Sequence, residues 1–305
     1  MSDGMRLALV ALRSTPTNVS LAHADVEGRH WEAMTPEDAL ARLRPGDAAL
    51  GRLDVLPTLD GIDDGMWALG ALQARGVVVL NDASALYATH DKLLTARLLR
   101  RTSLPHPRTV HVRPDRPFAA VRPPVVVKPR FGSGGQAVTW CEEENDLVET
   151  LSALSSRSWF AQQGVLVQEL VPPQGYDLRI LVAAERVVGA IFRIAADGEW
   201  RTNVALGGLR RPVSDPPRAA CELALAAAGA AGAELVGVDL VPDVNGNWTI
   251  IELNGAVEFT AEYNSDGDVF DLAASELARG AERVAAMESL ELEGLLRYQP
   301  GGATT

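Results

Sequence analysis

Residues 236–254 constrain the fold of this chain more than any other segment. They contain two apolar runs around Asn245-Gly246, and Asn-Gly between such runs is a strong signal for a tight β-hairpin. If Asn245 and Gly246 alone form the loop, Asp239 lies directly opposite Glu252 on one face of the hairpin. Asn254 is two residues beyond Glu252, so its side chain points to the same face.

Two carboxylates that face each other on an apolar hairpin destabilise it unless a positive charge lies between them. A hard divalent cation, held by both carboxylates and an amide oxygen, resolves this conflict. Mg²⁺ suits such a site, with Mn²⁺ as an alternative. The predicted metal ligands are therefore Asp239, Glu252 and Asn254. The alternative is a pair of solvated carboxylates on an exposed edge, which the apolar neighbours along both strands disfavour.

A glycine-rich loop follows Lys128, the last residue of a β-branched run. Glycines let backbone N–H groups approach phosphates, and the lysine supplies a point charge. The loop residues that we expect to contact phosphate are Gly132, Ser133, Gly134 and Gly135. The order strand, lysine, loop, strand differs from a P-loop, and no helix opens here as in a dinucleotide fingerprint. A plain flexible hairpin tip is the alternative interpretation.

Composition limits the class of protein and the cellular compartment that we expect. A chain of 305 residues forms two or three domains, and its net charge of −12 disfavours nonspecific binding of nucleic acid or of anionic membranes. The two cysteines, Cys141 and Cys221, form no metal-binding motif and fit a reducing compartment. We see no targeting or membrane segment and expect a cytoplasmic protein.

The N-terminal residues indicate a small α/β domain with a parallel sheet. Apolar runs at 7–12, 47–51 and 77–80 read as strands, and 61–75 has helical spacing. The residues Thr89-His90-Asp91-Lys92 begin an amphipathic helix that runs through Arg101, so we place the first domain boundary near residue 90. Further along, we expect strands at 125–128, 137–140, 165–170, 178–183, 186–194, 200–204, 235–241 and 248–253, and helices at 142–155, 216–232 and 269–287.

Taken together, these features resemble an ATP-grasp ligase of the RimK type over about residues 85–290. The resemblance rests on Lys92, Lys128 and its loop, Gln168-Glu169, Asp177 and Arg179, Arg201-Thr202-Asn203 with Gly207-Gly208, Asp239, Glu252 and Asn254. It implies an α/β plus α+β chain, an ATP-grasp fold preceded by an N-terminal α/β pre-ATP-grasp domain. The expected domains are residues 1–90, the central subdomain 91–163 with the glycine-rich loop and the C-terminal subdomain 164–300 with the metal site. A disordered tail, 301–305, follows.

The resemblance also implies roles by position. Residues expected to bind ATP are Lys92, Lys128, Gly132, Ser133, Gly134, Gly135, Glu169, Leu170, Asp177, Arg201, Thr202 and Asn203. Among them, Lys128, Arg201 and Asn203 are the expected catalytic residues, with Glu169 and Leu170 at the adenine and Asp177 at the ribose. The family chemistry transfers the γ-phosphoryl group to a carboxylate, an amine attacks the acyl phosphate, and ADP is released. No side-chain nucleophile is needed, and the loop could act as a lid.

The residues after the metal strand favour one branch of the family. Many RimK-type ligases follow the metal asparagine with Ala-Ser-Pro-Gly, whereas Gly255-Ala256-Val257-Glu258-Phe259 follows it here. This is similar to the branch that joins an amino acid to the C-terminal glutamate of a small amino-group-carrier protein in lysine and arginine biosynthesis. The resemblance implies an amino-acid substrate, a carrier protein or small acid as partner, and a homo-oligomer, a dimer or tetramer. Candidate substrate-binding residues are Arg179, Arg193, Asn254, Gly255 and Asn264.

Two other functions remain open. One is an ATP-grasp ligase that closes rings on a ribosomal peptide, although the sequence after the metal strand usually differs in that class. The other is a nucleotide-binding regulator without catalysis, which the complete set of expected metal ligands disfavours.

Overall fold

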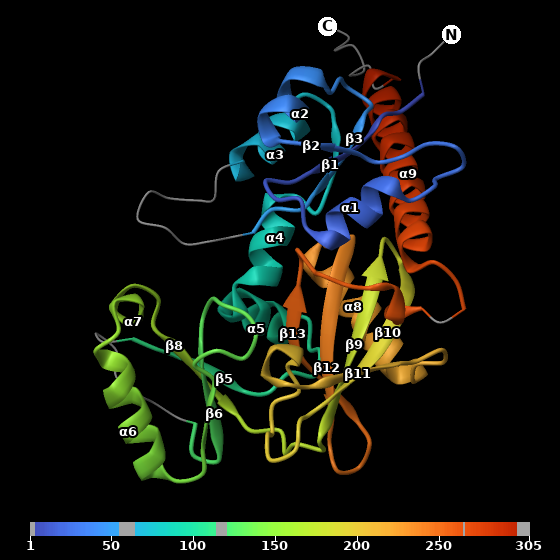
Figure 1. Cartoon of the computed structure of the whole chain (residues 1–305). Helices are drawn as coiled ribbons and strands as arrows, with labels where there is room; N and C mark the ends of the chain where they lie inside the picture. Colours follow the sequence, from blue (N-terminus) through green and yellow to red (C-terminus); the bar gives the residue numbers. More distant parts are fainter. Residues whose placement is uncertain (1–3, 55–64, 114–120, 265, 298–305) are drawn as a thin grey trace, which may run out of the picture.

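The computed structural model describes residues 4–54, 65–113, 121–264 and 266–297, which form three β-sheets (Figure 1). The tail expected at 301–305 lies outside the described residues. No helix in the described part of the chain is long and apolar enough to cross a membrane.

The N-terminal part of the chain is a four-stranded sheet in the order β2-β1-β3-β4, in which every neighbouring pair is parallel. Threonine side chains cap α1 and α2, and a proline follows each cap at the first helical position. The strands are β1 (Leu7–Val10), β2 (Glu32–Met34), β3 (Ala48–Gly51) and β4 (Val78–Leu80), and the helices are α1 (Pro16–His23), α2 (Pro36–Arg42), α3 (Met66–Gln73) and α4 (Ala83–His90). The parallel α/β arrangement expected here is confirmed, while β2, α1, α2 and α4 were not expected.

A second, antiparallel sheet has the order β5-β8-β6-β7 and its own small core with two helices. The glycine-rich loop joins β6 to β7. The elements are β5 (Thr109–Val112), β6 (Val125–Pro129), β7 (Thr139–Cys141), α6 (Glu144–Ser155), α7 (Ser158–Gln163) and β8 (Val165–Glu169).

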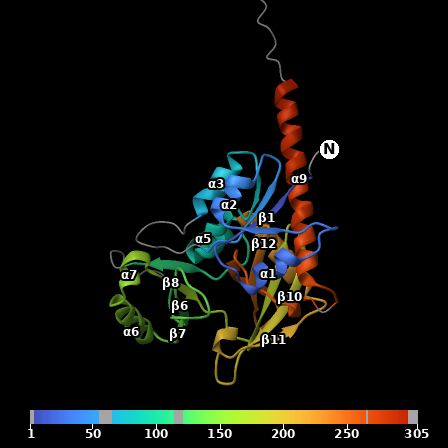
Figure 2. The ribbon, with the colours of Figure 1, turned by 45° about the horizontal axis from the view of Figure 1, so that its top comes forward.

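The third sheet is antiparallel, with five strands in the order β11-β10-β9-β12-β13. Side chains of α5 and α8 pack on one face, and α9 packs on the other face together with the N-terminal sheet. The elements are α5 (Lys92–Arg101), β9 (Tyr176–Ala183), β10 (Arg186–Ile194), η1 (Val204–Leu206), β11 (Leu209–Pro212), α8 (Arg218–Ala231), β12 (Leu235–Pro242), β13 (Trp248–Asn254), η2 (Ala261–Tyr263) and α9 (Val269–Arg297). The end of α9 extends past the rest of the molecule (Figure 2).

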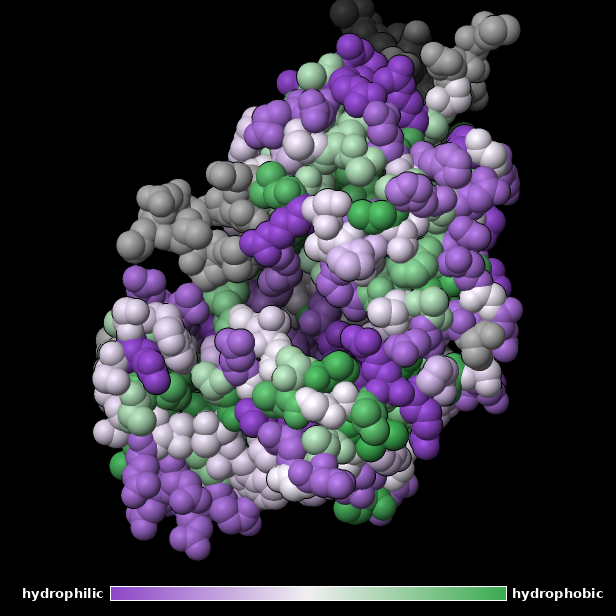
Figure 3. Space-filling view, viewed as in Figure 1, coloured by the Kyte–Doolittle hydropathy of each residue, from purple (hydrophilic) through white to green (hydrophobic). Residues whose placement is uncertain are grey.

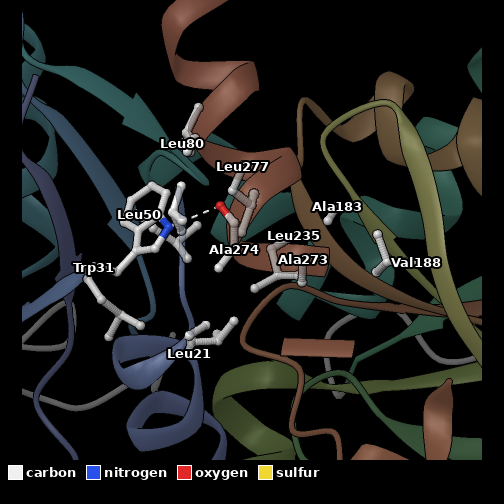
Figure 4. Close-up of a cluster of buried hydrophobic side chains, with 14 of the residues drawn as sticks. Leu21, Trp31, Leu50, Leu80, Ala183, Val188, Leu235, Ala273, Ala274 and Leu277 are labelled. Atoms are coloured by element: carbon white, nitrogen blue, oxygen red, sulfur yellow. Dashed lines mark hydrogen bonds between the residues drawn. The ribbon is translucent and has the colours of Figure 1, made fainter. Parts of the chain in front are cut away.

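One continuous core joins the N-terminal sheet to the five-stranded sheet. The buried indole of Trp31 donates a hydrogen bond to the backbone oxygen of Ala274 at 3.1 Å, which fixes α9 against the N-terminal unit (Figure 4). Asn81 donates to the backbone oxygens of Leu235 and Gly255 at 2.7 and 3.1 Å, across the same junction. The second sheet has a separate core, formed with α6 and α7.

The prediction of a strand at residues 200–204 is wrong. The backbone N–H groups of Trp200 and Arg201 donate to the Glu199 carboxylate at 2.9 and 3.0 Å, and a 3₁₀ turn follows at Val204–Leu206. Such local side-chain hydrogen bonds compete with strand pairing. The edge strand β11 begins only at Leu209.

The hairpin β12–β13 has the expected carboxylate pair but not the expected turn. The Asp243 N–H donates to the Asn247 oxygen at 2.8 Å, so Val244, Asn245 and Gly246 form the loop, and Gly246 has a φ of 81°. The prediction of a two-residue loop is therefore wrong. A bulge between Asp239 and Leu240 in the pairing shifts the register back. The two irregularities offset each other, and the pairing of Asp239 with Glu252 is confirmed.

Candidate active site

A cleft lies between the second sheet and the five-stranded sheet, with about 1110 Å³ of empty space measured out to its mouth. Figure 3 shows the surface hollowed there, with hydrophilic residues inside the hollow. Its lining includes all twelve residues expected to bind ATP: Lys92, Lys128, Gly132, Ser133, Gly134, Gly135, Glu169, Leu170, Asp177, Arg201, Thr202 and Asn203. Asp239 and Glu252 line the same cleft.

Two lysines bring positive charge to the cleft. Lys128, on β6, is buried and donates to the side-chain oxygen of Gln168 at 2.8 Å. Burial lowers the pKa of Lys128 to about 8; Glu252 opposes this shift and Lys92 adds to it. The Lys92 ammonium reaches Glu252 at 2.9 Å and the backbone oxygen of Gly132 at 2.6 Å. A partly desolvated pair of ammonium groups is a suitable site for phosphate oxygens.

The glycine-rich loop contacts residues 201–203 across the cleft. Arg201 donates to the backbone oxygen of Gly135 at 3.0 Å. Gly135 has a φ of 73°, and a Cβ there would lie 2.6 Å from the side-chain oxygen of Asn203. Only glycine therefore suits this point, where the loop approaches the opposite wall.

The end of β8 forms another part of the wall. The N–H groups of Glu169 and Leu170 already donate to the backbone oxygens of Arg108 and Pro124, at 2.9 and 3.2 Å. Recognition of an adenine edge would therefore use their carbonyl groups as acceptors. Gln168 connects Lys128 to His106, whose pKa is lowered to about 4 by burial and by Lys128, so this imidazole is neutral at pH 7. His106 lies far from any motif, and sequence reasoning missed it.

Asp239 is the centre of a buried ion-pair network on β9, β10 and β12. Arg179 donates to both of its carboxylate oxygens, at 2.5 and 2.6 Å, and Arg193 donates to one at 2.9 Å. Burial alone would raise the pKa of Asp239, but the two guanidinium groups outweigh it and lower the pKa to about 2. The positive charge beside the paired carboxylates thus includes two arginines, which the sequence-based argument had not considered.

The network also contains Asp177, expected at the ribose. Its buried carboxylate accepts from Arg193 at 2.8 Å and from the Thr202 hydroxyl at 2.5 Å. Arg193 borders the cleft and is held by two aspartates, whereas Arg179 is not part of the cleft lining and pairs with Asp239. For these two arginines, partners within the protein favour a role in holding the carboxylates over one in gripping a substrate.

Gly255 and Asn264, which were also expected to bind substrate, are not among the residues that line the cleft. The Asn264 amide donates to the Val188 oxygen at 3.4 Å and accepts from the Asp266 N–H at 3.0 Å. A Cβ on Gly255 would clash with the Thr89 hydroxyl, so Gly255 allows a close approach to α4.

The donor set of the hairpin fits a hard divalent cation. The Glu252 carboxylate is 26% exposed in the cleft, Asp239 lies opposite, and Asn254 follows on the same strand. Each carboxylate oxygen has two lone pairs, so Asp239 keeps acceptor capacity beside its arginines. In the described part of the chain no three His, Cys, Asp or Glu residues form a metal cluster, so the third protein donor would be the Asn254 amide.

A family model for the RimK-like ATP-grasp domain matches residues 89–273, which include the loop, both lysines and the carboxylate hairpin. The chain belongs to the RimK-like ATP-grasp family. Its sequence-based assignment to this family and to the ATP-grasp fold is confirmed.

Individual relatives agree with the family. A probable alpha-L-glutamate ligase of Legionella pneumophila is 30% identical over 63% of this chain and 64% of its own length. The aligned region thus spans less than two thirds of that relative. A glutamate–LysW ligase, ArgX, of Sulfolobus acidocaldarius is 27% identical over 70% of this chain and 78% of its own length. Among solved structures, a RimK domain ATP-grasp protein of Sphaerobacter thermophilus matches with a TM-score of 0.63 and 22% identity, over 90% of this chain and 99% of that one.

Proposed function

We propose that the protein is an ATP- and Mg²⁺-dependent, ADP-forming carbon–nitrogen ligase that joins an amino acid to a carboxylate. The observation that carries this proposal is the single cleft that combines the glycine-rich loop and two lysines with the Asp239–Glu252 pair. Phosphate-binding groups and metal-binding carboxylates on opposite walls of one cleft are what phosphoryl transfer to a carboxylate requires.

The residues of the cleft divide this work. Lys128 and Lys92 would bind phosphate oxygens, and Arg201 would hold the loop closed over them through Gly135. Asp239, Glu252 and Asn254 would hold Mg²⁺, which neutralises charge on the transferred phosphoryl group when bound. Arg179 and Arg193 fix the Asp239 carboxylate in position. Catalysis by such a site consists of positioning and charge neutralisation.

The chemistry then takes two steps. A substrate carboxylate oxygen attacks the γ-phosphorus of ATP, the bond to the β,γ-bridging oxygen breaks, and ADP leaves. The amino group attacks the acyl carbon, the acyl–oxygen bond breaks, and phosphate leaves with the amine proton passing to solvent. The products are an amide, ADP and phosphate, and no side-chain nucleophile takes part.

The names of the relatives support an amino acid as the amine and a protein such as LysW as the other substrate. Two kinds of name recur among them: glutamate ligases, and ligases that join glutamate or α-aminoadipate to LysW. We therefore propose that the carboxylate belongs to a small carrier protein or to a small acid.

Isotope transfer tests the mechanism directly. With a carboxylate substrate labelled with ¹⁸O, one labelled oxygen should appear in the released phosphate, as read by mass spectrometry, and ADP should equal amide in amount. AMP and pyrophosphate as stoichiometric products, or unlabelled phosphate, would refute the acyl-phosphate route. Glu252→Gln should stop ADP release, and the exposed Glu222→Gln on α8 is its control.

A further inference from the structure

A separate cavity, with about 680 Å³ of empty space measured out to its mouth, lies where the N-terminal sheet meets the loop that follows β13. Its lining combines residues from the start of α1, the end of β3 and that loop: Leu12, Arg13, Thr15, Asn18, Arg52, Leu53, Asp54, Ala256 and Glu258. Glu252 lines the ATP cleft, and Ala256 is four residues further on. At no more than roughly 3.6 Å per residue, Glu252 and Ala256 are at most about 14 Å apart.

Arg52 is the unusual residue of this cavity. Its side chain is 1% exposed, Nε donates to the Asn18 oxygen at 2.8 Å, and Nη2 donates to Glu258 at 3.1 Å. Its Nη1 has no hydrogen-bond partner among the described residues. Burial lowers the pKa of Arg52 to about 10, against the opposing effect of Glu258 and Asp54. A buried charged donor without a partner is costly, so a bound acceptor would stabilise it.

The acids of the cavity give the site a mixed character. The Glu258 carboxylate is 51% exposed and also accepts from the Thr15 hydroxyl at 2.9 Å. Beside the guanidinium of Arg52, therefore, lies a carboxylate with free acceptor capacity. A plain anion would be repelled by Glu258, and a plain amine would leave Arg52 unpaired.

We propose that this cavity binds the α-amino acid substrate, with its carboxylate on Arg52 and its ammonium group on Glu258. The proposal rests on the proposed ligase function and assigns the amine-binding site within it. It also transfers the carboxylate-binding role from Arg193, whose guanidinium is already held by Asp177 and Asp239, to an arginine with a donor to spare. The N-terminal unit would then complete the active site, which explains why one core fixes it to the five-stranded sheet.

Calorimetry tests this without turnover. The wild-type protein, with Mg²⁺ and a non-hydrolysable ATP analogue, is titrated with the twenty proteinogenic L-amino acids and with L-α-aminoadipate. The best binder is then compared with its decarboxylated amine and its deaminated acid. We expect both truncated compounds to bind at least tenfold more weakly. Failure of every amino acid to bind, or equal binding of the three compounds, would overturn the proposal.

Two variants identify the residues. Arg52→Lys keeps the charge but not the guanidinium fork, so the Kd of the amino acid should rise at least tenfold while the KM of ATP stays within twofold. Glu258→Gln changes a half-exposed side chain. It should weaken binding of the amino acid and strengthen binding of the deaminated acid. A structural role alone would not reverse this preference. Arg186→Lys, an exposed arginine on β10, is the control.

The outcomes distinguish a failure of the proposed amino-acid site from a failure of the proposed ligase function. If amino acids bind as described but release no ADP with any acid or carrier, the ligase function fails and the site stands. If an amino acid supports ADP release and the folded Glu258→Gln and Arg52→Lys proteins bind it like the wild type, the site is wrong and the function stands. Should Arg52→Lys not fold, the reversed preference of Glu258→Gln decides alone.

Discussion

Asp239 and Glu252 face each other as a pair, yet their removal should have very different effects on stability. Asp239 is 4% exposed and balances two guanidinium groups, the buried one of Arg193 and the partly buried one of Arg179. Removing one partner of a buried ion pair costs about 3–5 kcal/mol, because the remaining charge is uncompensated. Glu252 pairs with Lys92 at a partly exposed position, where such pairs contribute about 0–1 kcal/mol.

We therefore expect Asp239→Ala to lower the Tm by about 6–20 °C and Glu252→Ala by less than about 4 °C, at roughly 2–4 °C per kcal/mol. Both should abolish ADP release. Thermal unfolding by circular dichroism and a coupled ADP assay measure the two effects on the same preparations. Equal Tm values for the two variants would refute the ion-pair reasoning. Asp239→Ala combined with Arg179→Met should recover part of the lost stability but no activity.

Four shorter predictions follow from the same geometry. The arginine partners of Asp239 lower its pKa in the folded protein to about 2, below the ordinary 3.8. Its contribution to stability should therefore be present above pH 4 and lost as the pH falls toward 2. The free energies of unfolding of wild type and Asp239→Ala, measured by acid unfolding, should converge at that pH. The pKa of Lys128, about 8, predicts that the KM of ATP rises above pH 8, and a flat profile would contradict a charged Lys128 at the phosphates. Gly255→Ala should lose most activity because its Cβ meets the Thr89 hydroxyl, and adding Thr89→Ala should restore part of it. Mn²⁺ titration followed by electron paramagnetic resonance should show binding only when ATP is present.

The sequence was sufficient wherever a signal is local and repeated along a strand. The apolar alternation around Asp239 and Glu252 decides which side chains pack against α8, and a slip of one residue would turn them to the other face of the sheet. That constraint explains why the carboxylate pairing was correct although the turn was not. The hairpin absorbs a longer loop with a bulge, since burial of the apolar face outweighs the preference of Asn245-Gly246 for a two-residue turn.

The sequence could not predict which charged residues form ion pairs with each other. Asp177 and Asp239 lie far apart in sequence, and both find Arg193 only because β9 lies between β10 and β12 in the sheet. The sequence indicates the role of Arg52 even less, because this residue follows a short buried strand and resembles any arginine at a strand end. Its burial depends on a loop about 200 residues later in the chain, which contributes Glu258.

The ion pairs also bear on the order in which ligands bind. In the structure Asp239 is compensated by arginines and Glu252 by Lys92, so the carboxylates are not a bare acidic pair that attracts any divalent cation. A lone Mg²⁺ would have to compete with these cations and would gain little. On the proposed function, ATP would change the balance, because its phosphates would attract the ammonium groups of Lys92 and Lys128 and would free Glu252 to bind metal. The metal should therefore enter with the nucleotide, and the same lysine would connect phosphate binding to assembly of the metal site.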